Sequence, residues 1–267
     1  MKTRVYYTIA IFIFIMTFSS CASTIKLTLE SGKTIKAFYG SIDSNGKHPA
    51  IIYNHGTVVR KLGYSETAKR GYDVKDFVNA LNEEGFIVIA PIRKTGRLTW
   101  RRGQRPNVMN LSSSEWNNAV SEGIEAVDAA LYFLNNQPSV DSKKIGIVGF
   151  SEGGNIALWS AIKHEELEAI VLMSPANLGK AEDCRFENTY HKLNRISSPV
   201  FLTAGISDIE AIVQNCNVFI TLMNELNKDI DFRIDYPGDH KWFHKVREEY
   251  WDDIITFMKK NLNLHSP

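Results

Sequence analysis

The amino-acid sequence predicts an α/β fold, with a mostly parallel sheet, an antiparallel hairpin at its N-terminal edge and helices on both faces. The stretches Thr24–Leu29 and Lys33–Tyr39 alternate polar and apolar residues on either side of Ser31-Gly32, which is typical of a hairpin. Later runs are short and continuously apolar, as in strands buried on both faces of a parallel sheet. Helical patterns lie between these runs, and right-handed crossovers then place helices on both faces.

The later strands and the helices alternate along the rest of the chain. The apolar runs are Ala50–Tyr53, Phe86–Ala90, Lys144–Gly149, Ala169–Met173 and Val200–Thr203, and Asp231–Tyr236 is expected as the last strand. The helical segments are Asp73–Glu84, Ser114–Asn135, Asn155–Lys163, Ile209–Leu226 and Val246–Leu262. Asn177–Arg195 has no clear apolar period, and we interpret it as a small insertion near the rim of the functional site.

Length and composition are those of an ordinary folded protein. The chain has 267 residues, of which 44% are hydrophobic and 23% are charged. Because the net charge is only +1, nothing in the electrostatics indicates a nucleic-acid partner. Since no linker rich in Pro, Gly or Ser divides the chain, residues 21–267 are expected to form a single domain.

Residues 1–20 are expected to be a signal peptide. Lys2 and Arg4 form a basic start, and the apolar run that follows is shorter than the roughly 20 residues needed to span a bilayer. Phe18-Ser19-Ser20-Cys21 is similar to the lipobox of bacterial lipoproteins, which predicts Cys21 as the lipidated mature N-terminus. The alternative is ordinary secretory cleavage near Ala22. We therefore expect an exported protein that is lipid-anchored to a bacterial membrane on its periplasmic or cell-surface side, or else secreted to the periplasm.

Export affects how the remaining cysteines are interpreted. Cys184 and Cys216 form an even pair in an oxidising compartment, which allows a disulfide. Two buried thiols that pack as small apolar groups are the alternative.

A candidate nucleophile lies where a buried strand gives way to a helix. Ser151 is the central residue of Gly149-Phe150-Ser151-Glu152-Gly153, a G-x-S-x-G pattern. In this context the serine occupies a sharp turn that raises its hydroxyl above the sheet, and the glycines make room for the neighbouring strand and helix. A glycine-rich turn with an incidental serine is the alternative.

A serine hydroxyl needs a base to take its proton and an acid to orient that base. Asp208 follows the apolar strand that ends at Thr203, and His240 follows the strand that ends at Tyr236. Catalytic groups in open α/β sheets gather at the carboxyl ends of the strands, so Ser151, Asp208 and His240 are expected to converge. Their order along the chain, Ser then Asp then His, is that of hydrolases with this motif.

Other residues compete for these roles. Among the seven histidines, His244 and His265 also follow Asp208, but they fall near the final helix and in the tail. Asp235 and Asp239 lie beside His240 rather than in the loop of the preceding strand. The structural alternative for Asp208 is a helix N-cap.

The oxyanion of a tetrahedral intermediate needs backbone N–H donors that already point at it. The residue after the nucleophile, Glu152, is expected to supply one donor. The loop after Ala50–Tyr53 supplies the other, and Thr57 is the candidate because Gly56 permits an unusual backbone angle before it. His55 is interpreted as a structural residue that braces this loop.

The chain resembles the α/β-hydrolase superfamily, and within it the dienelactone-hydrolase-like and prolyl-oligopeptidase-like serine hydrolases. The resemblance covers essentially the whole mature chain, and it rests on Asn54-His55-Gly56, Gly149–Gly154, Gly205-Ile206-Ser207-Asp208 and Gly238-Asp239-His240. It implies an eight-stranded sheet, a Ser-His-Asp triad, an acyl-serine intermediate, no cofactor and no metal. True dienelactone hydrolases carry cysteine where this chain carries Ser151, so their particular substrate does not transfer.

A basic segment lies between Pro91 and Pro106. Its cationic residues are Arg93, Lys94, Arg97, Arg101, Arg102 and Arg105. Because it leaves the carboxyl end of a central strand, we expect Arg101 and Arg102 to bind an anionic group of the substrate by bidentate contacts. A solvated basic loop is the alternative.

The sequence therefore predicts an exported hydrolase that cleaves a small or medium carboxylic ester. A peptidase or amidase is the second enzymatic hypothesis, because the same triad cleaves amides. A catalytically inactive surface binding module is the third, and the presence of Ser151, Asp208 and His240 argues against it.

Overall fold

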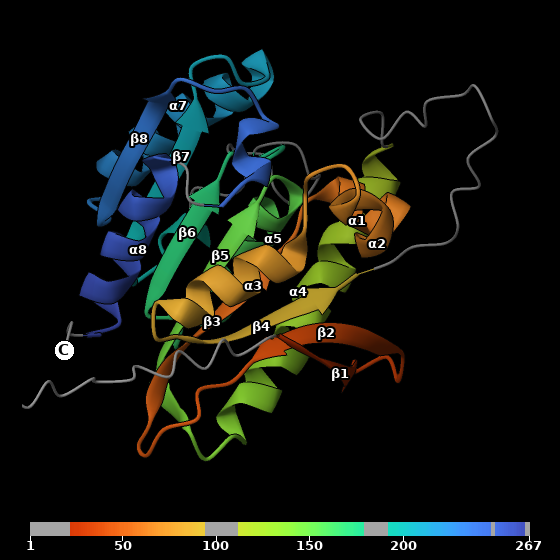
Figure 1. Cartoon of the computed structure of the whole chain (residues 1–267). Helices are drawn as coiled ribbons and strands as arrows, with labels where there is room; N and C mark the ends of the chain where they lie inside the picture. Colours follow the sequence, from red (N-terminus) through yellow and green to blue (C-terminus); the bar gives the residue numbers. More distant parts are fainter. Residues whose placement is uncertain (1–21, 94–111, 179–191, 247–248, 265–267) are drawn as a thin grey trace, which may run out of the picture.

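The computed structural model describes residues 22–93, 112–178, 192–246 and 249–264. These residues form an eight-stranded sheet in the order β1-β2-β4-β3-β5-β6-β7-β8 (Figure 1). β1 pairs antiparallel with β2 and β2 antiparallel with β4, whereas the other neighbouring strands are parallel. This confirms the predicted sheet. The strands are β1 Ser23–Thr28, β2 Thr34–Gly40, β3 His48–Asn54, β4 Ile87–Ile92, β5 Val140–Phe150, β6 Ala169–Met173, β7 Val200–Gly205 and β8 Ile230–Tyr236.

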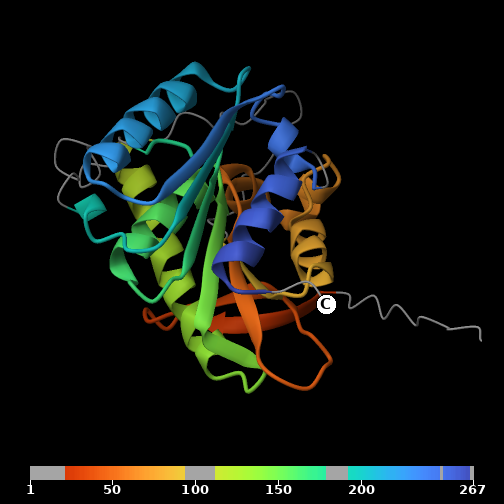
Figure 2. The same ribbon diagram turned by 90° about the vertical axis from the view of Figure 1, so that its left-hand side faces the viewer.

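Helices cover both faces of the sheet, as predicted. Figure 1 shows α3 and α8 on one face, and Figure 2, turned by 90°, shows α4, α5 and α7 on the other. The helices are α1 Thr57–Leu62, α2 Tyr64–Ala68, α3 Val74–Glu83, α4 Ser113–Asn135, α5 Glu152–Lys163, α7 Glu210–Glu225 and α8 Glu249–Asn261, with a 3₁₀ turn at Trp242–His244.

The apolar core is divided by the sheet into two clusters. Ile51 of β3 packs in one cluster with Phe77 of α3, and its neighbour Ile52 packs in the other with Val127 of α4. Successive side chains of a strand point to opposite faces, so a strand that is covered on both sides must be apolar at every position. This explains why the central strands have no polar alternation.

Some boundaries differ from the sequence-based expectation. α5 begins at Glu152 rather than Asn155, so Gly153 and Gly154 lie inside a helix despite their low helix propensity. Packing explains both glycines: a Cβ on Gly153 would lie 2.0 Å from the Asn54 carbonyl oxygen, and one on Gly154 would lie 2.8 Å from the Pro175 Cβ. α1, α2 and the 3₁₀ turn are too short to leave a periodic pattern, and none of them was predicted.

Candidate active site

Ser151 occupies a strained turn between β5 and α5. Its φ of 55° and ψ of −116° fall where L-residues rarely lie, and strain of this kind costs roughly 1–3 kcal/mol. The turn is held by a hydrogen bond from the Ser151 N–H to the Met173 carbonyl, 2.9 Å. Gly149 allows the turn to close, because a Cβ there would lie 2.1 Å from the Gly153 carbonyl oxygen. The strained turn therefore lowers the stability of the fold while it holds the Ser151 hydroxyl in this position.

The predicted base and acid meet Ser151 at the carboxyl ends of β7 and β8. His240 Nε2 lies 3.0 Å from Ser151 Oγ, and its Nδ1 lies 3.0 Å from Asp208 Oδ1. The Asp208 carboxylate is fully buried, while 17% of the His240 side chain is exposed. With Nδ1–H donating to Asp208, Nε2 is free to accept the serine proton. The structure thus brings together the three side chains that were predicted from the sequence to converge.

Ser174 is a fourth polar side chain at this site, and sequence reasoning missed it. It follows β6 directly, is fully buried and has a φ of 42°. Its hydroxyl donates to Asp208 Oδ2 at 2.5 Å and lies 2.7 Å from His240 Nδ1. The available signal was its position, because a polar residue just past the carboxyl end of a central strand faces the site.

Asp208 is fixed from several sides. Besides His240 and Ser174, its Oδ1 accepts the Ile209 N–H at 2.7 Å. α7 begins at Glu210 with Ile209 as its N-cap residue, so Asp208 is not the cap of that helix. The alternative of a purely capping aspartate is therefore wrong.

The competing residues have structural tasks. The His244 ring stacks on Tyr72 with centroids 4.7 Å apart, and burial together with the nearby His240 lowers its pKa to about 4. Asp239 accepts the backbone N–H groups of Lys241 and Trp242, which fixes the turn after His240. Asp235 pairs with Arg233 at 3.4 Å on the exposed side of β8.

Both candidate oxyanion donors are first residues of helices. Glu152 begins α5 and Thr57 begins α1, and helix geometry leaves the first N–H groups without intrahelical acceptors. Gly56 has an ordinary φ of −76°, so the expected unusual backbone angle there is wrong. Limited space favours the glycine instead, because a Cβ would lie 3.1 Å from the Phe150 ring and 3.2 Å from the Ser151 Cβ.

The Glu152 side chain lies at the centre of a buried ion cluster. Arg60 donates to both carboxylate oxygens, from Nε at 2.8 Å and from Nη2 at 2.7 Å, and Arg93 Nη1 donates at 2.7 Å. Thr57 Oγ1 adds a fourth hydrogen bond at 3.0 Å. Burial alone would raise the pKa of Glu152, but the hydrogen bonds and charges of both arginines lower it to about 2. Glu152 is therefore an ionised, fully hydrogen-bonded carboxylate.

His55 is a structural residue, as predicted. Its Nε2 accepts the Arg93 backbone N–H at 3.0 Å, so Nδ1 carries the proton and donates to the Gly56 carbonyl at 3.0 Å. Burial and the Arg93 charge lower the pKa of His55 well below its usual value. A neutral imidazole thus ties the end of β4 to the loop after β3.

Within the basic segment, Arg93 lies in the part of the chain that the structure describes, and it is not solvated. Its side chain is only 2% exposed, and it bonds Glu152 and the His55 carbonyl oxygen. Arg101 and Arg102 lie outside the described residues, as do Cys21 and Cys184. Cys216 is buried as a free thiol, and burial raises its pKa to about 12.

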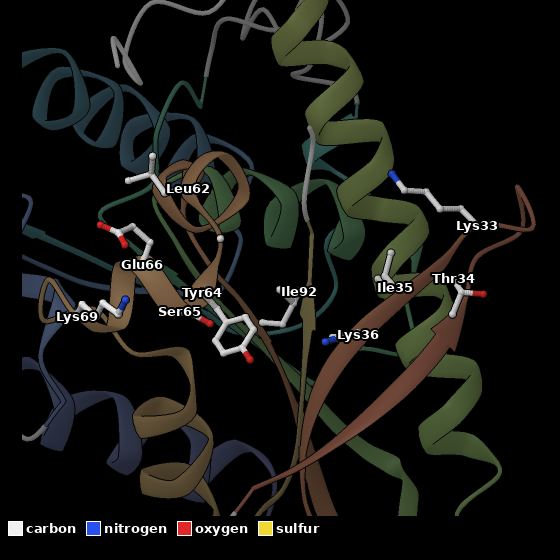
Figure 3. Close-up of a pocket in the computed structure, with 11 residues that line it drawn as sticks. Lys33, Thr34, Ile35, Lys36, Leu62, Tyr64, Ser65, Glu66, Lys69 and Ile92 are labelled. Atoms are coloured by element: carbon white, nitrogen blue, oxygen red, sulfur yellow. The ribbon is translucent and has the colours of Figure 1, made fainter. Parts of the chain in front are cut away.

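A pocket of about 440 Å³ opens at the end of the sheet where β2 begins and β4 ends (Figure 3). The start of β2, the end of β4 and the α1–α2 turn line it. Its basic side chains are Lys33, Lys36 and Lys69. Ser151, Asp208 and His240 are not among the lining residues, so this pocket is separate from the serine site.

Within the described ranges, no helix has the length and apolar character needed to cross a membrane.

Comparisons with known proteins agree with the fold. A stretch of 124 residues is 31% identical to dipeptidyl-peptidase 5 of Porphyromonas gingivalis, and it covers 46% of this chain but only 16% of that protein. A Klebsiella pneumoniae structure named as a dienelactone hydrolase has a TM-score of 0.66 and 17% identity, covering 91% of this chain and 99% of that one. An esterase structure from Pyrococcus furiosus has a TM-score of 0.63 and 19% identity, covering 90% of this chain and 93% of that one. The model of the dienelactone hydrolase family matches residues 65–260, and the chain therefore belongs to that family.

Proposed function

We propose that the protein is a serine hydrolase that cleaves a carboxylic ester through an acyl-serine intermediate, without a cofactor. The observation that carries the proposal is the hydrogen-bonded series from Ser151 Oγ through His240 to Asp208, with 3.0 Å at each step. A nucleophile, a base and an orienting acid within this reach are the groups that acyl transfer requires.

In the first half of the reaction, His240 Nε2 takes the proton of Ser151 as Oγ attacks the ester carbonyl carbon. A C–O bond forms, and the carbonyl π electrons move onto oxygen, where the amides of Glu152 and Thr57 bind the negative charge. Collapse of this intermediate breaks the bond to the alcohol, which leaves with the proton from His240. Asp208 stabilises the imidazolium that forms between these two steps.

In the second half, water replaces the alcohol. His240 takes a proton from water as its oxygen attacks the acyl carbon, and the same amides bind the second oxyanion. Collapse releases the carboxylic acid, and His240 returns the proton to Ser151 Oγ. Every proton is returned within the cycle, so no further co-reactant is needed.

A peptidase or amidase is the second candidate, and the match to dipeptidyl-peptidase 5 favours it. That match spans 16% of the relative, so the activity of the whole relative is not carried over with it. The esterase with a similar fold matches over 93% of its own length, which supports the ester as the leading substrate class.

Rate constants on matched substrates separate the two candidates. We expect kcat/KM for short p-nitrophenyl esters to exceed that for the p-nitroanilides of the same acids by more than the difference in intrinsic reactivity. The reverse order, with removal of dipeptides from longer peptides, would establish the peptidase instead. Ser151→Ala should abolish both activities, and undiminished turnover in that variant would exclude Ser151 as the nucleophile.

We also propose export, supported by the basic start, the apolar run and Cys21 in the first part of the sequence. In this proposal the lipidated Cys21 anchors the hydrolase to a bacterial membrane, on its periplasmic or cell-surface side.

A further inference from the structure

Thr57, Arg60, Arg93 and Glu152 form a hydrogen-bonded group next to the serine turn, which we call the brace; Thr57 is half-buried and the other three are buried. At least 95% of the side chains of Arg60, Arg93 and Glu152 is buried, with exposed fractions of 5%, 2% and 0%. The Glu152 carboxylate accepts four hydrogen bonds from this group, which uses all of its acceptor positions. The Glu152 carboxylate is therefore held both from α1 and from the residue that follows β4.

The members of the brace also carry the two candidate oxyanion donors. Glu152 supplies one backbone N–H, and Thr57 supplies the other. The Thr57 hydroxyl bonds the Glu152 carboxylate at 3.0 Å, so the two donor residues are joined through their own side chains. Arg60 lies one turn after Thr57 in α1 and makes a bidentate contact to the same carboxylate. α1 and α5 are thus linked where their first residues meet.

Arg93 connects this link to the rest of the sheet edge. It follows β4, and its guanidinium joins Glu152 to the backbone carbonyl of His55, in the loop that leads to Thr57. Its backbone N–H bonds the His55 ring. The loop that carries Thr57 is thereby held from its start at β3 and from the first turn of α1.

We infer that the brace is a positioning device, which fixes the separation and direction of the Glu152 and Thr57 amides and so sets the rate of acyl transfer. This inference rests on the proposed function. Oxyanion stabilisation depends on donors that are in place before charge develops. Arg60, Arg93 and the Glu152 carboxylate act through those amides and do not touch the substrate.

Stability alone does not account for a brace of this kind. A buried ion pair gains little over well-packed apolar side chains of similar volume, because both charges lose their hydration. Here two guanidinium groups surround one carboxylate in the interior, next to the nucleophile. This arrangement supplies rigid, directional hydrogen bonds, which an apolar cluster of the same volume would lack.

The test compares steady-state kinetics of the full chain on a p-nitrophenyl ester, with kcat expressed per site that gives a product burst. Thr57→Val keeps the backbone amide and the side-chain volume but loses the hydroxyl that joins the donors. Glu152→Gln removes the carboxylate charge and keeps the backbone N–H that is the candidate oxyanion donor. We expect kcat to fall about tenfold to a hundredfold in both variants, with KM within about threefold of wild type, because misplaced donors weaken transition-state binding.

Two further variants separate positioning from charge. Arg60→Gln lowers the net charge of the brace, whereas Glu152→Gln raises it. Positioning predicts that kcat falls in both, and that Arg60→Lys, which keeps one donor to Glu152, lies between Arg60→Gln and wild type. Arg70→Gln breaks the exposed pair of Arg70 with Glu66 and should leave kcat unchanged.

Wild-type kcat in Thr57→Val and Glu152→Gln would overturn the inference, and so would a kcat that rises in Glu152→Gln while it falls in Arg60→Gln. If Glu152→Gln does not fold, Thr57→Val decides alone. Absence of Ser151-dependent turnover in the wild-type chain would instead remove the proposed function, and the inference with it.

Discussion

Ser174 illustrates how one buried hydroxyl can organise the acid and the base together. It donates to Asp208 Oδ2 and lies 2.7 Å from His240 Nδ1, so it borders the bond between the two residues. A carboxylate that must accept hydrogen bonds in fixed directions benefits from a donor on its second oxygen, because the donor prevents the carboxylate from rotating.

Ser174→Ala should therefore lower kcat by about tenfold to a hundredfold, since a hydrogen bond to a charged group contributes roughly 1.5–3 kcal/mol. Steady-state ester hydrolysis is the measurement. Ser160→Ala is the matched control, because Ser160 is also a buried serine but its hydroxyl has no hydrogen-bond partner in the described part of the chain. Equal rates for the two variants would exclude a positioning role for Ser174.

Glu152 predicts how stability depends on pH. Its pKa falls from the usual 4.5 to about 2 on folding, so the folded chain holds this carboxylate ionised where the unfolded chain protonates it. The stabilisation is present above about pH 4.5 and is lost as the pH falls toward 2.

Urea unfolding between pH 5 and pH 2.5 tests this prediction. Glu152→Gln should lower stability at pH 5 and should also flatten its decline with acid. Glu66→Gln is the control, because Glu66 is an exposed carboxylate that also pairs with an arginine, and exposed pairs contribute little. A decline in Glu152→Gln as steep as in wild type would contradict the assignment.

At the scale of elements, α4 and α5 approach closely at Gly123. A Cβ on Gly123 would lie 2.2 Å from Ile156 Cδ1 and 2.6 Å from its Cγ1, and Ile156 is fully buried. Glycine inside a helix costs about 1 kcal/mol relative to alanine, so packing must outweigh this cost.

Gly123→Ala is therefore expected to destabilise the chain by about 1–3 kcal/mol in spite of its better helix propensity. In an Ile156→Ala background the same substitution should become stabilising, because the clash is gone and the propensity gain of up to about 1 kcal/mol remains. Chemical unfolding of all four chains gives the coupling. Additive effects would show that the two helices do not meet at this pair.

The elements that the sequence predicted well are those with a strong local signal. Uniformly apolar strands and the amphipathic α4 have such a signal, and so do the glycines around Ser151. The predicted start of α5 at Asn155 was wrong because tertiary packing, rather than helix propensity, places Gly153 and Gly154 in a helix. The sequence could show only that Arg93 belongs to a basic segment, because its actual partner, Glu152, is distant in the sequence.

For the whole molecule, the described part of the chain begins at Ala22, the residue after the proposed anchor. Ala22 is 5% exposed, and its N–H donates to Asn79 Oδ1 at 3.0 Å. A lipid on Cys21 would therefore hold the domain close to the membrane at this point.

Detergent-phase partitioning of the chain made in a bacterium that processes lipoproteins tests the anchor. The wild-type chain should enter the detergent phase, and Cys21→Ala should stay in the aqueous phase because it has no thiol to lipidate. Cys216→Ala changes a buried thiol and should partition like wild type. Wild-type partitioning of Cys21→Ala would favour ordinary secretory cleavage or another mode of attachment.

If Ser151 is a nucleophile activated by His240, which Asp208 orients, it should react with a fluorophosphonate. Mass spectrometry of the chain after this reaction is the measurement. We expect one covalent adduct on the peptide that contains Ser151, absent in Ser151→Ala and formed much more slowly in His240→Ala. A folded wild-type chain without an adduct, or an adduct that persists in Ser151→Ala, would contradict it.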